Sequence, residues 1–253
     1  MRSKFSNPFA EFPREVGVIV FASFFVAVGF GIIAPTIPLF ARSFGVNHAQ
    51  VGAIVSTFAF ARFASGLFSG KLVDQFGERW VYSIGIGFVA ITSFAAGLAQ
   101  NYEQLLIFRA VGGIGSSMFS VAAGSILVRA VGDDHRARVQ SLYNGTFLLG
   151  MIAGPAVGGA LSAFSLRAPL LIYGVFLLGA SSSGAILLRH SALAAKPSAD
   201  QQNDVVTLKS ALTLKPYRLA LFVSFCSAWP FFSSWLRWSP SLPADSCALE
   251  AGS

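Results

Sequence analysis

Charged side chains are scarce in this chain of 253 residues and make up 11% of it, against about 25% in a typical soluble domain. Histidine and cysteine are scarcer still, with three and two residues, and neither shows the spacing of a metal site or a disulfide framework. Neither the metalloprotease motif H-E-x-x-H nor the hydrolase motif G-x-S-x-G occurs. We therefore expect no catalytic residues, no bound metal and no cofactor.

Apolar residues are abundant and lie in long runs. They account for 54% of the chain, whose mean hydropathy is +0.65. A helix needs about 20 mostly apolar residues to cross a bilayer core, and six runs approach or exceed that length: residues 16–41, 49–70, 80–99, 105–128, 139–163 and 169–188. The first run is too long for the apolar core of a secretion signal. The sequence therefore predicts an all-α membrane protein.

The other segments are assigned from their composition. Residues 1–15 precede the first span, residues 189–216 form a polar linker, and residues 217–238 offer a seventh, poorer span. Residues 239–253 are rich in serine and proline and cannot span. The change of composition near Ser233 leads us to expect a truncated or frameshifted chain with an aberrant tail.

Basic residues are distributed unequally between the connectors. Thirteen of the 18 lysines and arginines lie at the N-terminus, after the second and fourth predicted spans, and after the sixth. Because cytoplasmic loops carry the excess of these residues, the pattern predicts a cytoplasmic N-terminus and a cytoplasmic linker. This topology accounts for most of the net charge of +7, and we expect no nucleic-acid partner.

The connector after the second span carries a pattern of glycine and charge. Its residues are Gly70, Asp74, Gly77 and Arg79. Glycine suits a tight turn, and an acid and a base at helix ends can pair with each other or with helix dipoles. The pattern resembles a motif between helices 2 and 3 of the major facilitator superfamily, but Gln75 and Glu78 stand where that family prefers basic residues. The alternative interpretation is an ordinary charged turn.

Two other spans contain patterns similar to motifs of this family. In the fourth, Arg109 is followed by Gly113 and Gly115, as on helix 4 of proton-coupled members. In the first, three residues resemble a helix 1 pattern of drug:proton antiporters: Gly29, Pro35 and Pro38. An arginine inside a span is costly unless it faces a cavity or partner, although Arg109 lies near enough to the start of its span to snorkel to the interface. The two prolines help a helix bend, but membrane helices also tolerate proline generally.

The fifth span contains the most informative pattern. It matches the antiporter motif of the same family at five positions: Gly145, Gly154, Pro155, Gly158 and Gly159. Gly150, Gly154 and Gly158 recur every four residues, so they lie on one helix face, and small residues in a row allow helix backbones to approach closely. Pro155 removes a backbone donor and predicts a kink.

The four patterns occur in the order that the family requires, so residues 16–190 resemble the N-terminal half of a major facilitator transporter. The resemblance implies a six-helix bundle of two inverted three-helix repeats, a partial seventh helix, and a substrate site between two halves. It also implies a gating role for the motif of the helix 2–3 turn, a charge relay at Arg109 with its glycines, and a hinge at the motif of the fifth span.

Arg62 lies deep in the second span. A central arginine needs a cavity or a partner, so it either binds an anionic substrate group or serves as the structural partner of a polar residue. No acid lies at mid-depth in the six spans. The carboxylate that carries protons would therefore be Asp74 or belong to a missing half.

The function implied by the resemblance is efflux of small, drug-like organic solutes by proton antiport in the cell membrane. The expected partners are lipid, the solute, protons, and either a C-terminal half or a second copy of the chain. The alternative is a non-transporting remnant or a partner-dependent structural subunit. A membrane-embedded enzyme ranks lowest, because it would need several acids or histidines at a membrane face.

Overall fold

The computed structural model describes residues 13–189 together with residues 213, 215, 218, 219 and 222. The chain separates into two compact units, Met1–Pro197 and Ser198–Ser253. Most of the predicted linker at 189–216 and of the seventh span at 217–238, and all of the tail at 239–253, lie outside the described residues. These three assignments, like most of 1–15, remain predictions.

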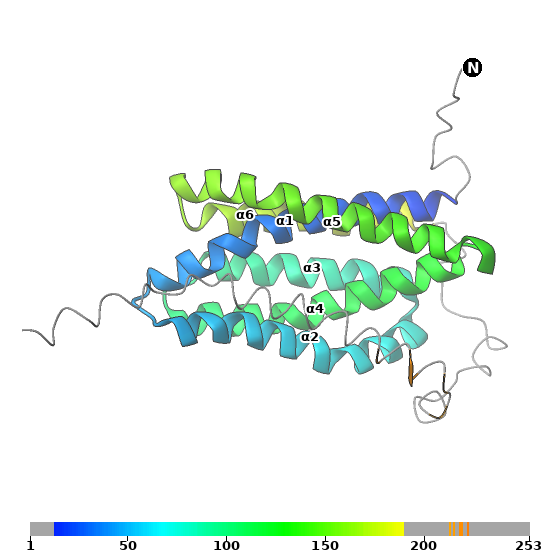
Figure 1. The fold of residues 1–253 in the computed structure, drawn as a ribbon, viewed down its shortest axis with the longest axis horizontal. Helices are drawn as coiled ribbons and strands as arrows, with labels where there is room; N and C mark the ends of the chain where they lie inside the picture. Colours follow the sequence, from blue (N-terminus) through cyan, green and yellow to red (C-terminus); the bar gives the residue numbers. More distant parts are fainter. Residues whose placement is uncertain (1–12, 190–212, 214, 216–217, 220–221, 223–253) are drawn as a thin grey trace, which may run out of the picture. The chain divides into compact units, whose positions relative to one another are not determined.

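Six helices make up the described part of the first unit (Figure 1), and they confirm the predicted all-α fold. They are α1 (Arg14–Arg42), α2 (His48–Phe76), α3 (Glu78–Gly97), α4 (Tyr102–Arg129), α5 (Asp133–Phe164) and α6 (Ala168–Leu187). Each predicted span overlaps one helix. The largest differences are at the end of α2 and the start of α5, where six additional residues are helical. Hydropathy marks only the apolar part of a helix, whereas the lysine, glutamine and arginine residues in these segments are good helix formers.

The helices are long and apolar enough to cross a membrane. Five qualify alone, and α2 qualifies when its segments His48–Gly66 and Phe68–Phe76, inclined by 50°, are taken together. The length and composition of the described helices therefore allow six spans.

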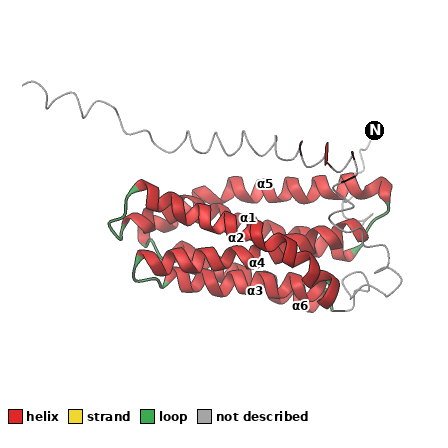
Figure 2. Ribbon diagram, turned by 90° about the horizontal axis from the view of Figure 1, so that it is seen from below, coloured by secondary structure: helices red, strands yellow, loops and turns green. Residues whose placement is uncertain are grey.

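The packing of the helices shows an internal symmetry (Figure 2). α1 packs mainly on α5 and α6, α4 packs mainly on α2 and α3, and α3 and α6 pack on each other. Exchanging α1 with α4, α2 with α5 and α3 with α6 leaves this set of pairs unchanged. Consecutive spans cross the membrane in alternating directions, so the first helices of two three-helix repeats, α1 and α4, run in opposite directions. The predicted pair of inverted three-helix repeats is thus confirmed.

The same packing leaves one side of the bundle uncovered. α2 and α5 stand at the two ends of the series of packed described helices. In the most apolar stretch of α5 only 17% of the residues are buried, against 61% in α1. The face between α2 and α5, which we call the open face, is therefore available to a further partner.

Glycines bring α5 and α1 into backbone contact. A Cβ added at Gly154 would lie 2.5 Å from the backbone of Gly31, and one added at Gly150 would lie 2.8 Å from the Ala27 side chain. A Cβ at Gly158 would likewise overlap the backbone of Ile32. The four-residue spacing seen in the sequence is therefore the contact face of α5, as close helix packing in lipid requires.

The starts of α2 and α4 are fixed together. Asn47 accepts a hydrogen bond from the backbone N–H of Gln50 at 2.9 Å, and Asn101 accepts one from Gln104 at 2.9 Å. Such caps satisfy N–H groups that the first helical turn leaves unpaired. The Tyr102 hydroxyl then donates to the Gln50 carbonyl at 2.9 Å. The two helices therefore run parallel from a common level.

Candidate functional site

Arg62 lies at mid-length of α2 and bonds to the middle of α4. Its Nη1 donates to the Ser116 hydroxyl at 2.5 Å and its Nη2 to the Ser120 hydroxyl at 2.8 Å. Arg62 and Ser116 are each 14 residues past the start of their helices, so the common level of the two starts places them at the same depth. At 1.5 Å per residue, that depth is about 21 Å along the helix.

Arg109 is buried one to two turns away from this pair. Only 6% of it is exposed, and its guanidinium lies 4.6 Å from the centre of the Phe58 ring. Among the described residues its Nε has no hydrogen-bond partner. Arg109 therefore points into the bundle and does not snorkel to the interface.

The glycines that follow Arg109 explain how it comes so close to α2. A Cβ added at Gly113 would lie 2.5 Å from the Phe58 carbonyl oxygen and 3.0 Å from the backbone nitrogen of Arg62. A Cβ at Gly115 would lie 2.7 Å from the Gly85 carbonyl oxygen on α3. These two glycines hold α4 against α2 and α3 and thereby set the position of both arginines.

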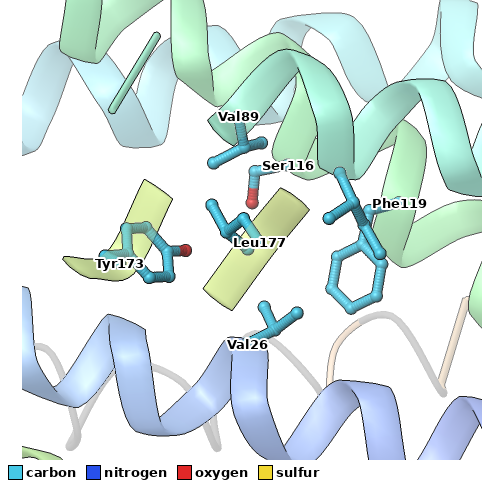
Figure 3. A pocket seen from close by; sticks show the side chains of 7 residues that line it. Val26, Val89, Ser116, Phe119, Tyr173 and Leu177 are labelled. Carbon is cyan, nitrogen blue, oxygen red and sulfur yellow. The ribbon is translucent and has the colours of Figure 1, made fainter. Parts of the chain in front are cut away.

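A small cavity lies where four helices meet (Figure 3). It is lined by Val26, Ile86, Val89, Ser116, Phe119, Tyr173 and Leu177 and has a volume of about 10 Å³. Figure 3 shows the Ser116 and Tyr173 hydroxyls directed toward the space around Leu177. A volume of this size holds at most about one water molecule. The cavity is therefore too small for an organic solute.

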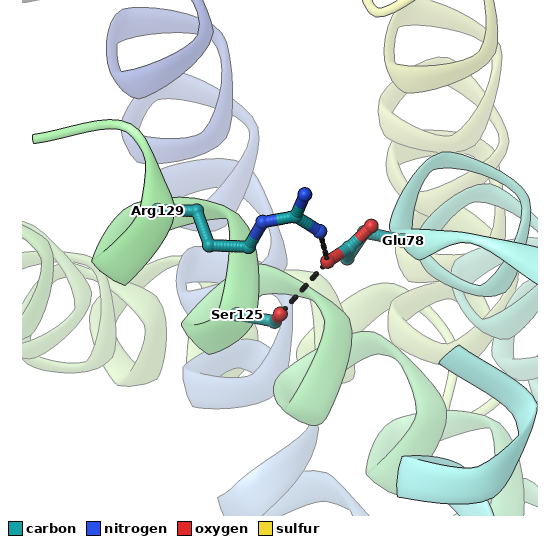
Figure 4. A network of polar contacts seen from close by, with 3 residues as sticks. All are labelled: Glu78, Ser125 and Arg129. Carbon is teal, nitrogen blue, oxygen red and sulfur yellow. Dashed lines mark hydrogen bonds and ion pairs between the residues drawn. The ribbon is translucent and has the colours of Figure 1, made fainter. Parts of the chain in front are cut away.

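A second polar group lies at the end of the bundle where α2 meets α3 (Figure 4). Glu78 is 1% exposed and forms an ion pair with Arg129 at the end of α4. The Ser125 hydroxyl donates to the same carboxylate oxygen at 3.0 Å. The ion pair links the first turn of α3 to the last turn of α4.

Arg79 anchors the start of α3 to the end of α6. Its Nε and Nη2 donate to the Ala185 carbonyl oxygen at 3.2 and 2.8 Å, and its guanidinium lies 4.8 Å from the centre of the Trp80 ring. The negative end of the α6 dipole is thus the partner of Arg79. Of the two pairings expected from the sequence, the one with a helix dipole forms and the one with Asp74 does not.

Asp74 lies two residues before the end of α2. It is exposed and makes no hydrogen bond or ion pair within the described part of the chain. A negative charge near the C-terminus of a helix is unfavourable. Gly77, which joins α2 to α3, has a φ of 84°, a conformation that suits glycine.

Comparison with known proteins decides the family. The family model described as "Major Facilitator Superfamily" matches residues 19–251, which is most of the chain. The chain belongs to the major facilitator superfamily. It is therefore classed with membrane transporters and not with enzymes, and it is a multi-pass membrane protein.

Two curated members of the superfamily illustrate the similarity. Quinolone resistance protein NorA of Staphylococcus aureus is 23% identical over 161 residues, which cover 64% of this chain and 42% of NorA. Multidrug resistance protein 2 of Bacillus subtilis is 23% identical over 179 residues, which cover 70% of this chain and 45% of that protein. The chain spans less than half the length of these curated relatives.

Solved structures of the superfamily share the fold. A peptide transporter POT in complex with sulfate superimposes with a TM-score of 0.66 at 17% identity, over 86% of this chain and 46% of that chain. A POT family transporter in complex with a thioalcohol-conjugated peptide gives 0.67 at 13% identity, over 89% and 47%. The described bundle is thus one half of a superfamily fold.

The remaining superfamily motif positions divide into packed and open ones. A Cβ at Gly29 would lie 2.6 Å from a ring carbon of Tyr173, so that glycine makes room for the ring. Three other motif glycines have nothing near them within 4 Å: Gly70, Gly145 and Gly159. Pro35 and Pro38 lie inside α1, and Pro155 lies inside α5; both helices continue through them. Of the motif on the fifth span, only Gly154 and Gly158 belong to the α1 contact.

Several residues of the site were not predicted from the sequence. Ser116 and Ser120 could have been found from their four-residue spacing, which places both hydroxyls on one face of α4. Glu78 and Arg129 could have been suspected because opposite charges flank two spans on the same predicted side. Their pairing across 51 residues needs the three-dimensional arrangement.

Proposed function

We propose that this chain supplies the N-terminal half of a secondary active transporter in the cell membrane that exports small organic solutes in exchange for protons. The observation that carries the proposal is its membership of the superfamily together with two relatives whose names refer to quinolone and multidrug resistance. The open face between α2 and α5 is where a second half would complete the site.

In this proposal the end of the bundle near the α2–α3 turn acts as a gate. Asp74 is exposed, unpaired within the described chain and unfavourably placed at the end of α2. A carboxylate in that position gains most from a partner outside this half, such as the N-terminal end of a helix. Gly77 and Arg79 fix the turn that presents it, and Arg109 is assigned a role in proton-linked switching.

The proposal is tested in inside-out membrane vesicles that contain the purified chain, where a second copy of the chain can serve as the second half. An acid interior should drive uptake of a small fluorescent organic dye, and collapsing the proton gradient should abolish that uptake. Empty vesicles provide the control. Uptake that does not depend on the proton gradient would contradict antiport.

Replacing Asp74 by asparagine should separate transport from stability. We expect proton-driven uptake to fall at least about tenfold, whereas thermal stability should be unchanged or slightly raised, because the replacement removes a charge that α2 disfavours. Gln75→Ala, at the adjacent exposed position, is the matched control and should change neither property. Equal uptake by the Asp74→Asn and Gln75→Ala variants would remove Asp74 from the gate.

We further propose that the N-terminus is cytoplasmic, since lysine and arginine gather on that side of the predicted spans. The orientation is tested in variants with Cys226 and Cys247 replaced by serine and one new cysteine at an exposed position. A membrane-impermeant maleimide should label Gln100→Cys in intact cells, and Gln75→Cys only after permeabilisation. The opposite labelling pattern would show an inverted topology.

A second candidate function is that of a partner-dependent subunit, which the open face favours. In that case vesicles with the chain alone would show no proton-driven uptake, and activity would appear only on adding a second polypeptide. Uptake by the chain alone defeats this candidate.

A further inference from the structure

We propose that Arg62 binds the carboxylate of a transported aromatic acid, with Ser116 and Ser120 holding Arg62 in place and the buried Arg109 adding a second positive charge nearby. This inference rests on the proposed transport function and names its substrate class.

The first step is the position of Arg62. It lies at mid-length of α2 and is exposed there, and within the described part of the chain it bonds to the two serine hydroxyls, which are neutral. A guanidinium has five N–H donors, so donors remain and the charge is not neutralised. A cation at that depth in a membrane requires a cavity or an anion.

The second step is that a second cation lies nearby. Arg109 rests on the Phe58 ring, and Phe58 precedes Arg62 by one turn of α2. Like charges repel each other strongly in a medium of low dielectric constant. An anion bound to Arg62 would offset that repulsion.

The third step is the position of the acids. In the described helices all acids lie in a first or last turn: Glu15, Asp74, Glu78, Glu103, Asp133 and Asp134. Asp74 is twelve residues after Arg62, or about 18 Å along the helix. Glu78 already pairs with Arg129. The described half therefore holds two interior cations with no interior anion to match them.

The fourth step concerns the shape of the anion. A planar carboxylate matches the two parallel N–H donors of a guanidinium. Phe30 is partly exposed and its ring centre lies 6.4 Å from that of Phe58, so it supplies aromatic surface near the arginines. A flat aromatic body that carries a carboxylate satisfies both the charges and the rings.

The test measures binding to the purified full chain in lipid nanodiscs by calorimetry at neutral pH. The probes are 2-naphthoate and its neutral isostere 2-naphthamide. Charge-assisted hydrogen bonds should favour naphthoate by about tenfold to hundredfold. Arg62→Gln should abolish that preference, Ser120→Ala should reduce it, and Arg62→Lys should retain part of it because the charge remains. Arg42→Gln, at the end of α1, is the matched control and should keep the full preference.

Two outcomes overturn the inference. One is equal affinity of the unaltered chain for naphthoate and naphthamide. The other is a preference for naphthoate that survives in Arg62→Gln, shown to be folded by its circular dichroism and elution volume. Binding is measured without transport, so loss of proton-driven uptake with an intact preference would contradict the proposed function alone. Uptake without the preference would contradict this site alone.

Discussion

Replacing Arg129 by alanine is expected to destabilise the folded bundle by about 3 kcal/mol. The replacement leaves the Glu78 carboxylate, which is 1% exposed, without its cationic partner. The Ser125 hydroxyl remains within 3.0 Å of it, but one neutral donor does not compensate a buried charge. The loss should appear as a lower midpoint in thermal or SDS-induced unfolding of the purified protein.

Two companion variants show whether the effect belongs to the ion pair. Lys71→Ala removes an exposed positive charge near the same end of the bundle and should change the midpoint little, since exposed charges contribute less than about 1 kcal/mol. Combining Glu78→Gln with Arg129→Gln should recover part of the loss, because no uncompensated charge is then buried. A midpoint for Arg129→Ala equal to that of Lys71→Ala would mean that the pair does not stabilise the fold.

Replacing Gly154 by valine should destabilise the bundle by about 1–3 kcal/mol or more. The new Cβ would lie 2.5 Å from the backbone of Gly31, and backbone cannot move aside as a flexible side chain can. α5 must therefore separate from α1 along the contact that holds it. The measurement is the unfolding midpoint, supported by the fraction of monodisperse protein in size-exclusion chromatography.

Gly159→Val is the matched control for this prediction. It adds the same side chain to the same helix five residues later, where nothing lies within 4 Å. Its effect on stability should be limited to the difference in helix propensity, which favours valine over glycine. Similar losses in both variants would show that the α1–α5 contact is not as close as described.

The sequence predicts the fold of this chain well because apolar runs determine the spans directly. Each of the six apolar runs corresponds to one helix of the structure. The resemblance to the superfamily predicted the repeat symmetry that the helix packing shows. Helix ends were less well predicted, since the charged segment that leads to Phe76 is helical but not apolar. The spacing of Gly150, Gly154 and Gly158 predicted a close contact without naming α1 as the partner.

The candidate site was predicted only in part. The sequence indicated that Arg62 and Arg109 need partners, but a single sequence does not show that Ser116, Ser120 and Phe58 are those partners. Glu78 was noted as a departure from the superfamily pattern, and the structure gives the reason for an acid there, because Arg129 lies opposite it. Pairs of this kind depend on which helices are neighbours, which the local pattern does not contain.

The first two helices of this bundle pack mainly on helices that come later in the sequence and are not their neighbours, because α1 packs on α5 and α2 packs on α4. During synthesis α2 therefore leaves the ribosome before its partner exists. Arg62 has to wait for Ser116, which follows it by 54 residues, or roughly 3 to 11 seconds at about 5–20 residues per second. In that interval a charged side chain at mid-membrane depth has no serine partner. We expect the insertion machinery to keep α2 out of the lipid until α4 has been synthesised. The order in which the helices are released is then part of how this sequence folds.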